Sequence, residues 1–508
     1  MEFVSHPWIN PNTIEKRDYQ ERIVNTAVTG NTLCVIPTGL GKTSIAALVA
    51  VDCIRRGGKK ILFLAPTRPL VDQHRKTFEK FLKVGIELVT VTGFIKPEER
   101  AGLYKKNDII FATPQTIRND VKNGIIDLDY FSLVIFDEAH RAVGEYAYPY
   151  IARKYMVRPE GKLILALTAS PGSFRYKINE VKNKLFIKNV EIRTRDDMDV
   201  KPYVQKLEQK RVVVELPTAM KKIKEYLEAV KNDRMKKLIN WKIVNSYYIS
   251  KSQIISLQES LARKAKSGYS GVTYAAMSVL AEVLKVDHAL ILLETQSLFS
   301  LGNYFDKVLE QKTKAVARLE KDENFQNAIR LTRELLKEGH EHPKISRLRE
   351  IISEELKRNK YANIIVFAQY RNTITRIKQA LEEIPNAAPV EFIGQAKKSG
   401  KGMSQKEQIE ILSEFRMGFY NILVASQIGE EGLDIEETDA VIFYEPIPSA
   451  IRKIQRAGRT ARTRAGKVIV LMTKDTRDEA YHWSGYHKEK KMTKMLYSMK
   501  NQKELSDF

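Results

Sequence analysis

Cysteine and long apolar runs are what this chain of 508 residues has least of. Cys34 and Cys53 are its only cysteines, which excludes a disulfide framework and a cysteine-rich zinc site and fits a reducing compartment. No apolar stretch approaches the roughly 18 residues that cross a bilayer. The opening residues, M-E-F-V-S-H-P-W, lack a basic segment leading into an apolar one. We therefore expect no secretory signal peptide, no membrane association and a cytoplasmic location.

Positive charge is in excess, with a formal net charge of +23 and a pI near 9.6. An anionic partner follows from this balance, with nucleic acid as the first candidate, although a lysine-rich surface would give the same composition. The length suggests about three domains. A hydrophobic content of 43% is enough for sizeable cores.

Residues 36–43 read I-P-T-G-L-G-K-T and lie between an apolar run at 31–35 and a helical apolar pattern at 44–55. A strand, a glycine turn and a helix are the context of a phosphate-binding loop. Its backbone N–H groups curl around a phosphate, its lysine reaches the outer phosphates, and its threonine hydroxyl ligates magnesium. The strict pattern has glycine where Ile36 stands, and glycine turns also occur for structural reasons. The candidate nucleotide-binding residues here are Pro37, Thr38, Gly39, Gly41, Lys42 and Thr43, with Thr43 also a candidate magnesium ligand.

The segment R-D-Y-Q precedes this loop at residues 17–20. A glutamine offers both a donor and an acceptor, which is what the edge of adenine requires. Arg17 and Gln20 are therefore candidate adenine-binding residues. A surface helix start explains the same letters equally well.

Short apolar strands at 61–65, 108–112, 133–137 and 163–168 alternate with longer amphipathic segments. This alternation predicts a parallel sheet with helices on both faces, which binds ligands at the carboxyl ends of its strands. Each of these strands ends in a polar cluster: A-P-T-R, A-T-P-Q, D-E-A-H and T-A-S.

The D-E-A-H cluster places two acids directly after an apolar strand. Two carboxylates at a buried strand end are costly without a cation, and magnesium bound to a triphosphate supplies one. We expect Asp137 to hold the metal and Glu138 to orient and deprotonate the attacking water. The alternative is an acidic helix N-terminus.

Proline is absent between Pro217 and Pro343, and apolar residues recur there at three- and four-residue spacing. This pattern predicts several packed helices. Residues 205–335 hold 23 basic and 15 acidic side chains, with tyrosines and Trp241 among them. Aromatic rings near lysines can stack on bases, so we expect nucleic-acid contact by this region, although buried tyrosines are commoner.

Strand–helix alternation resumes near Tyr361, in a lobe with no glycine–lysine–threonine loop of its own. Such a lobe is expected to supply groups to the first. The clearest candidates for such groups are in the segment Q-R-A-G-R-T-A-R at 455–462, where Arg459 and Arg462 lie three residues apart and therefore on one face of a helix. An arginine placed against the γ-phosphate contributes roughly 10³–10⁵ in rate. The candidate catalytic residues are Lys42, Asp137, Glu138, Gln455, Arg459 and Arg462, and Asp434 is a candidate ribose contact.

Taken in order, these segments resemble the successive motifs of a superfamily 2 helicase core of the DEAH-box type. The insert between the lobes makes the chain similar to the branch that holds Hef and FANCM, above all to the archaeal Hef helicase region. The resemblance implies two RecA-like lobes, ATP hydrolysis and remodelling of forked or branched DNA in repair, at the nucleoid in a prokaryote. It also implies that residues in the strand-end clusters contact the nucleic-acid backbone or couple the lobes. These residues are Thr67, Arg68, Thr113, Gln115, Thr168 and Ser170.

The expected fold class is α/β, with two RecA-like parallel-sheet lobes and an all-helical domain inserted between them. We place the first lobe at 1–204, the insert at 205–335, the second lobe at 336–480, and a basic helix or linker at 481–508. Two other functions stay open: a double-stranded-RNA-stimulated ATPase of the same superfamily, and a non-catalytic, ATP-gated DNA-binding scaffold. Hef also carries a nuclease domain, which would lie outside this chain, so we expect no nuclease activity from these residues. The sequence does not predict an oligomeric state.

Overall fold

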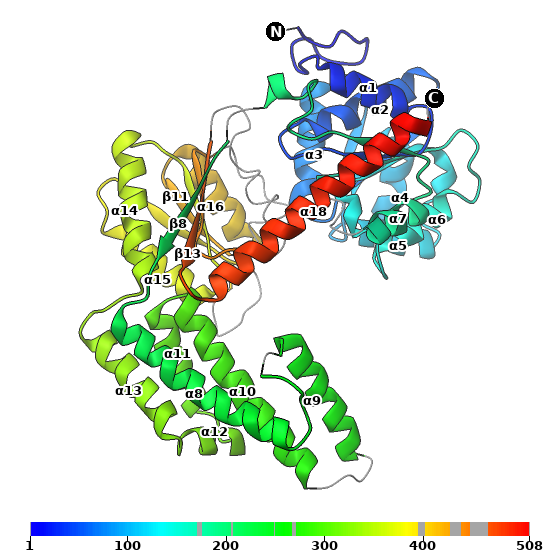
Figure 1. The fold of residues 1–508 in the computed structure, drawn as a ribbon. Helices are drawn as coiled ribbons and strands as arrows, with labels where there is room; N and C mark the ends of the chain where they lie inside the picture. Colours follow the sequence, from blue (N-terminus) through cyan, green and yellow to red (C-terminus); the bar gives the residue numbers. More distant parts are fainter. Residues whose placement is uncertain are drawn as a thin grey trace.

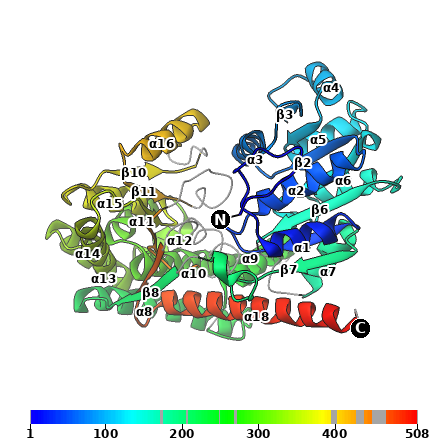
Figure 2. The same cartoon turned by 90° about the horizontal axis from the view of Figure 1, so that it is seen from above.

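The computed structural model describes residues 2–169, 175–204, 207–247, 249–266, 271–394, 402–426, 438–447 and 466–506. Two lobes, each a sheet flanked by helices, lie side by side, and a helical bundle projects from the second (Figures 1 and 2). The predicted architecture of two parallel-sheet lobes with an all-helical domain between them in the sequence is confirmed. Among the described helices, none combines the length and the apolar character that a membrane crossing needs.

The first lobe is built on a parallel sheet whose described strands run in the order β3-β4-β2-β5-β6-β1-β7. Its strands are runs of branched and aromatic residues, and alternate side chains enter two separate cores on opposite faces. Leu62 and Leu64 belong to one core, Ile61 and Phe63 to the other. The strands are β1 (Thr32–Val35), β2 (Lys60–Leu64), β3 (Leu88–Val91), β4 (Ile109–Ala112), β5 (Phe131–Phe136), β6 (Leu163–Thr168) and β7 (Asn189–Ile192).

Helices follow most strands of this lobe, as parallel connections require. They are α1 (Asp18–Ala27), α2 (Lys42–Arg55), α3 (Arg68–Phe81), α4 (Pro97–Lys106), α5 (Pro114–Lys122), α6 (Ala147–Tyr155) and α7 (Arg175–Lys184). Proline occupies the first turn of α3, α4 and α5, where its missing N–H costs nothing.

The insert is a bundle of long helices with apolar cores of its own. The proline-free stretch forms α8 (Thr218–Asn240), α9 (Lys251–Lys266), α10 (Val272–Thr295), α11 (Leu298–Leu309), α12 (Lys314–Leu319) and α13 (Glu323–Lys337). The carboxylate of Asp322 accepts from the backbone N–H groups of Asn324 and Phe325 and so caps α13.

The second sheet runs β10-β11-β9-β12-β13-β8 and is also parallel. Its elements are β8 (Leu207–Val214), α14 (Pro343–Arg358), β9 (Ile364–Phe367), α15 (Arg371–Glu382), β10 (Pro389–Phe392), α16 (Gln405–Met417), β11 (Ile422–Ala425), β12 (Ala440–Phe443), β13 (Gly466–Thr473) and α18 (Arg477–Ser506).

One boundary differs from the sequence prediction. The insert was expected from residue 205, but Leu207–Val214 forms strand β8 and pairs along its length with β13 in the second sheet. The run L-E-Q-K-R-V-V-V does not look like a buried strand, because β8 is an edge strand of the sheet, where polar side chains are exposed. The helices therefore begin at Thr218.

Helix α18 leaves β13 and crosses to the first lobe (Figure 1). Met492 and Leu496 pack into the core of that lobe, and the Tyr497 hydroxyl hydrogen-bonds the Thr194 hydroxyl at 3.1 Å. One helix thus contacts both lobes.

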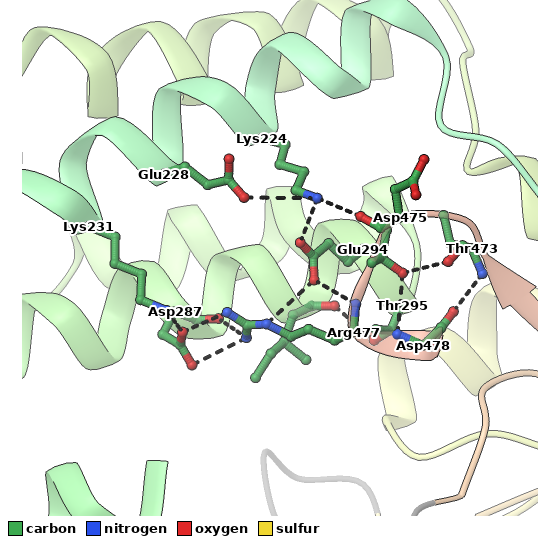
Figure 3. A network of polar contacts seen from close by, with 12 residues as sticks. Lys224, Glu228, Lys231, Asp287, Glu294, Thr295, Thr473, Asp475, Arg477 and Asp478 are labelled. Atoms are coloured by element: carbon green, nitrogen blue, oxygen red, sulfur yellow. Dashed lines mark hydrogen bonds and ion pairs between the residues drawn. The ribbon is translucent and has the colours of Figure 1, made fainter. Parts of the chain in front are cut away.

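At its other end, α18 is fastened to the bundle by a polar network (Figure 3). Arg477 pairs with Asp287 and Glu294 of α10, and Lys224 of α8 reaches Glu294 at 3.3 Å. Beside it, the fully buried Asp478 pairs with the fully buried Lys344 of α14. The bundle and the second lobe are therefore joined through charged groups with little access to water.

Candidate functional site

Sheet topology brings three sequence-predicted segments to one edge. Strands β5, β6 and β1 are neighbours and parallel, so their carboxyl ends lie together. The D-E-A-H acids follow β5, the glycine loop follows β1, and Thr168 is the last residue of β6. This edge is where open parallel sheets bind ligands.

The glycine loop has the backbone that its sequence predicts. Gly39 and Gly41 have φ angles of 84° and 77°, in the left-handed region that favours glycine. A Cβ on Gly41 would lie 2.4 Å from the Gln20 amide nitrogen, so no other residue fits without moving that side chain. Lys42 and Thr43 open α2, whose N-terminal N–H groups and dipole favour an anion.

Gln20 is packed against this loop. Its Nε2 donates to the Leu40 carbonyl at 3.2 Å, and the Tyr19 hydroxyl donates to the same oxygen at 2.8 Å. The Gln20 Oε1 is buried and has no hydrogen-bond partner within the described ranges. A buried acceptor without a donor fits the amino group of adenine. Arg17 is held by Glu15 at 2.7 Å, so its guanidinium is committed to the chain itself.

Asp137 follows β5 and is almost fully buried. Its backbone N–H donates to the Leu64 carbonyl at 2.9 Å, and its own carbonyl accepts from the Tyr148 hydroxyl at 2.6 Å. Its Oδ2 lies 3.0 Å from His74 Nε2, and His74 Nδ1 lies 3.3 Å from Thr43 Oγ1. The two predicted magnesium ligands, Thr43 and Asp137, are thus held by one imidazole ring.

Glu138 adopts φ 49° and ψ 49°, a left-handed conformation that costs a non-glycine residue about 1–3 kcal/mol. Its carboxylate lies 3.3 Å from His140 Nδ1, which also lies 3.1 Å from the Thr168 hydroxyl. Burial raises the pKa of Glu138, but His140 and the charges of Lys42 and Arg141 outweigh it and lower the pKa well below the usual range. The carboxylate is therefore ionised at neutral pH, the form that can orient a water and accept its proton.

The clusters after β2 and β4 line a separate polar pocket of about 540 Å³. Beneath it, the buried Arg100 binds Asp120 through two nitrogens and fixes α4 against α5. Beside it, the Arg68 guanidinium stacks over the ring of Phe94, which is 76% exposed. Four predicted residues line this pocket: Thr67, Arg68, Thr113 and Gln115. Thr168 instead lies with His140 at the acidic edge.

The glycine loop also faces the second lobe. Pro37 and Thr38 share a cavity of about 240 Å³ with Gln209 of β8, Val468 of β13 and Met492 of α18. The first lobe's phosphate loop is therefore close to the edge of the second sheet.

Some predicted residues lie outside the described ranges: Ser170, Asp434, Gln455, Arg459 and Arg462. The roles of all the site residues stay predictions. Sequence reasoning missed His74 and Tyr148. Their side chains meet Asp137 from other helices, and no local spacing indicates that.

The sequence matches three family models, one for each part of the fold. "DEAD/DEAH box helicase" matches residues 17–178, "Helicase conserved C-terminal domain" matches 343–464, and "Putative ATP-dependent RNA helicase, helical bundle" matches 219–339. Among solved structures, the crystal structure of the Pyrococcus furiosus Hef helicase domain is similar with a TM-score of 0.75 and 42% identity. The match covers 94% of this chain and 99% of that one.

Two relatives show how the chain compares with longer proteins. The "Putative ATP-dependent RNA helicase MJ1505" of Methanocaldococcus jannaschii is 42% identical over 98% of this chain, and the match spans 63% of that protein. The "DEAD-box ATP-dependent DNA helicase Fancm" of Drosophila melanogaster is 32% identical over 92% of this chain, and the match spans 34% of that protein. The chain therefore spans less than two thirds of the length of these relatives. Its lobes and bundle match the Hef helicase domain almost end to end, and the chain belongs to the Hef/FANCM branch of the superfamily 2 ATP-dependent helicases.

Proposed function

We propose that this chain uses ATP and Mg²⁺ to translocate on DNA and remodel forked or branched DNA in repair. The observation that carries the ATP half is the shared edge of β5, β6 and β1, where the glycine loop and the D-E-A-H acids meet. The DNA half is supported by relatives named as DNA helicases, among them Fancm of Drosophila melanogaster and fml1 of Schizosaccharomyces pombe.

The residues present fit a magnesium ion. Thr43 supplies a hydroxyl oxygen and Asp137 a carboxylate, and Mg²⁺ prefers such oxygen ligands together with water and phosphate. His74 contacts both groups, one through each ring nitrogen, so a single imidazole ring separates them. When bound, the ion would neutralise charge on the phosphates.

Within this proposal, the glycine loop and Lys42 bind the phosphates, and Gln20 accepts from the adenine amino group. Glu138 orients the attacking water. From the second lobe, Arg459 and Arg462 act on the γ-phosphate, Gln455 is a further catalytic residue, and Asp434 accepts from the ribose. Lobe closure on ATP and opening after hydrolysis then shift the strand-binding surfaces past each other.

Two surfaces suit the nucleic acid. The first is the polar pocket lined by Thr67, Arg68, Thr113 and Gln115. The second is the end of α8, where Trp241 is 38% exposed and Tyr247 is 45% exposed beside the exposed Lys242. Exposed rings among cations can stack on bases while the cations neutralise phosphates.

A panel of ATPase assays tests the proposal. Forked DNA, linear duplex DNA, single-stranded DNA and duplex RNA are compared as stimulators at one salt concentration. The proposal expects the largest rise in turnover with forked DNA. Equal stimulation by linear and forked DNA would remove the branch preference.

The second candidate function is an RNA-stimulated ATPase, favoured by the names of the Methanocaldococcus jannaschii relative and of the helical-bundle family. Greater stimulation by duplex RNA than by any DNA would establish it instead.

A double variant, Trp241→Ser with Lys242→Glu, tests whether the helical bundle contributes to the fork preference. Its fork preference should fall, whereas the exposed Val157→Ser in the first lobe should leave it unchanged.

A further inference from the structure

We propose that His74 is a positioning residue of the magnesium site, which holds the Thr43 hydroxyl and the Asp137 carboxylate in place through its two ring nitrogens. This inference rests on the proposed use of Mg²⁺ and adds a residue that neither the phosphate loop nor the D-E-A-H acids contain.

The geometry is that of a bridge. His74 Nδ1 lies 3.3 Å from Thr43 Oγ1, and His74 Nε2 lies 3.0 Å from Asp137 Oδ2. His74 is 7% exposed, and it comes from α3, the helix that follows β2. A third element of the lobe therefore ties the start of α2 to the end of β5.

Packing fixes the ring before any ligand binds. The imidazole lies 4.5 Å from the Phe63 ring, measured between centroids, and Phe63 in turn packs against Phe78 and Phe111. Asp137 is held from the other side by the Leu64 carbonyl and the Tyr148 hydroxyl. With the His74 ring and the Asp137 backbone constrained, the bridge has little freedom to rearrange, which is what preorganises a metal site.

Hydrogen-bond chemistry sets the direction of the bridge. An ionised carboxylate only accepts hydrogen bonds, so the Nε2–H of His74 is the donor to Asp137 Oδ2. In the neutral imidazole, Nδ1 then accepts a hydrogen bond from the Thr43 hydroxyl. A hydroxyl that donates a hydrogen bond to the ring keeps its oxygen lone pairs for a cation. The carboxylate likewise has a second oxygen for the cation or its waters.

Loss of such supporting contacts typically weakens metal affinity by about 10–100-fold. The test measures binding of a fluorescent ATP analogue in EDTA and across a Mg²⁺ titration, without hydrolysis. His74→Phe keeps a ring against Phe63 but has no nitrogen. His74→Gln keeps an amide that can reach Asp137. Phe78→Leu is the matched control, because it disturbs the same aromatic cluster on the same helix and leaves both hydrogen bonds intact.

The half-saturating Mg²⁺ concentration should rise about 10–100-fold in His74→Phe. It should rise less in His74→Gln and stay at the wild-type value in Phe78→Leu, with nucleotide affinity in EDTA equal in all four proteins. An unchanged Mg²⁺ requirement in His74→Phe overturns the inference, and so does an equal loss of affinity with and without Mg²⁺. If His74→Phe does not fold, His74→Gln decides by the same titration. If the nucleotide affinity of the wild type does not depend on Mg²⁺, the proposed magnesium site itself is overturned, and this inference with it.

Discussion

Arg477 Nη2 lies 2.7 Å from Asp287 Oδ1, so the first residue of α18 is clamped to the middle of α10 in the bundle. The same guanidinium reaches Glu294 at 3.5 Å. Asp287 and Glu294 are 14% and 5% exposed at their side chains, so Arg477 neutralises two carboxylates that water hardly reaches. Burial raises the pKa of Glu294, whereas Arg477 and Lys231 outweigh burial at Asp287 and lower its pKa.

Arg477→Met should detach the bundle from the second lobe in part. Removing one member of a buried ion pair costs about 3–5 kcal/mol when the remaining charge is left without a partner. Asp287 would keep Lys231, and Glu294 would keep Lys224, so the loss in Arg477→Met should lie below that range. Lys474→Met is the control, since its pair with Glu215 has side chains 50% and 60% exposed and such pairs contribute about 0–1 kcal/mol. Hydrogen exchange in α10 reports the difference. Equal exchange in Arg477→Met and wild type would show that the clamp does not hold the bundle.

His342 makes stability depend on pH. Burial and the charge of Lys344 lower the pKa of His342 from 6.5 to about 3. At a pH between these two pKa values, His342 is protonated in the unfolded chain and neutral in the native state. Stability conferred by the neutral ring is therefore complete above pH 6.5 and falls as the pH drops, by about 1.4 kcal/mol per pH unit.

His342→Asn should remove this dependence while keeping a side-chain acceptor for the cap of α14. Urea unfolding at pH 6.5 and 5.0 measures it: the wild type should lose about 2 kcal/mol more than the variant. The exposed His340→Asn should keep the wild-type loss. Identical losses in wild type and His342→Asn would contradict the assignment.

Glu138→Gln should abolish most turnover. The amide keeps the shape of the side chain but not the charge that orients water, and such groups contribute about 10²–10⁴-fold. Binding of an ATP analogue should be unchanged. Glu145→Gln, an exposed acid a few residues on, should hydrolyse ATP as the wild type does. Absence of turnover in the wild type as well would favour a non-catalytic scaffold.

Arg68→Gln should weaken DNA binding uniformly across sequences and reduce the salt slope of log affinity by about 1, the result of losing one phosphate contact. Lys76→Gln is the control, because Lys76 is exposed on the same helix and does not line the pocket. A slope unchanged in Arg68→Gln would place the strand elsewhere.

The glycine loop and the strand-end acids could be predicted because their chemistry is local. Buried parallel strands are continuous apolar runs, and the polar residues after them necessarily meet at one edge. Strands β3, β7 and β10 were not predicted, and all three are edge strands: β3 and β7 of the first sheet and β10 of the second.

Other features depend on tertiary contacts. His74 is 63 residues from Asp137 in sequence, and only the packing of α3 against β2 brings them together. The polar residues of β8 are equally typical of an exposed helix face, and only the pairing with β13 shows that they form a strand. The basic composition of α18 gives no sign that Met492 and Leu496 enter the core of the first lobe.

Single-turnover ATP hydrolysis by the double variant Arg459→Gln with Arg462→Gln, with saturating forked DNA, tests most directly whether both lobes form the site. We expect a rate about 10³–10⁵-fold below wild type, with binding of an ATP analogue retained. A rate equal to that of the wild type would show that the second lobe contributes no arginine to the reaction and that the first lobe hydrolyses ATP alone.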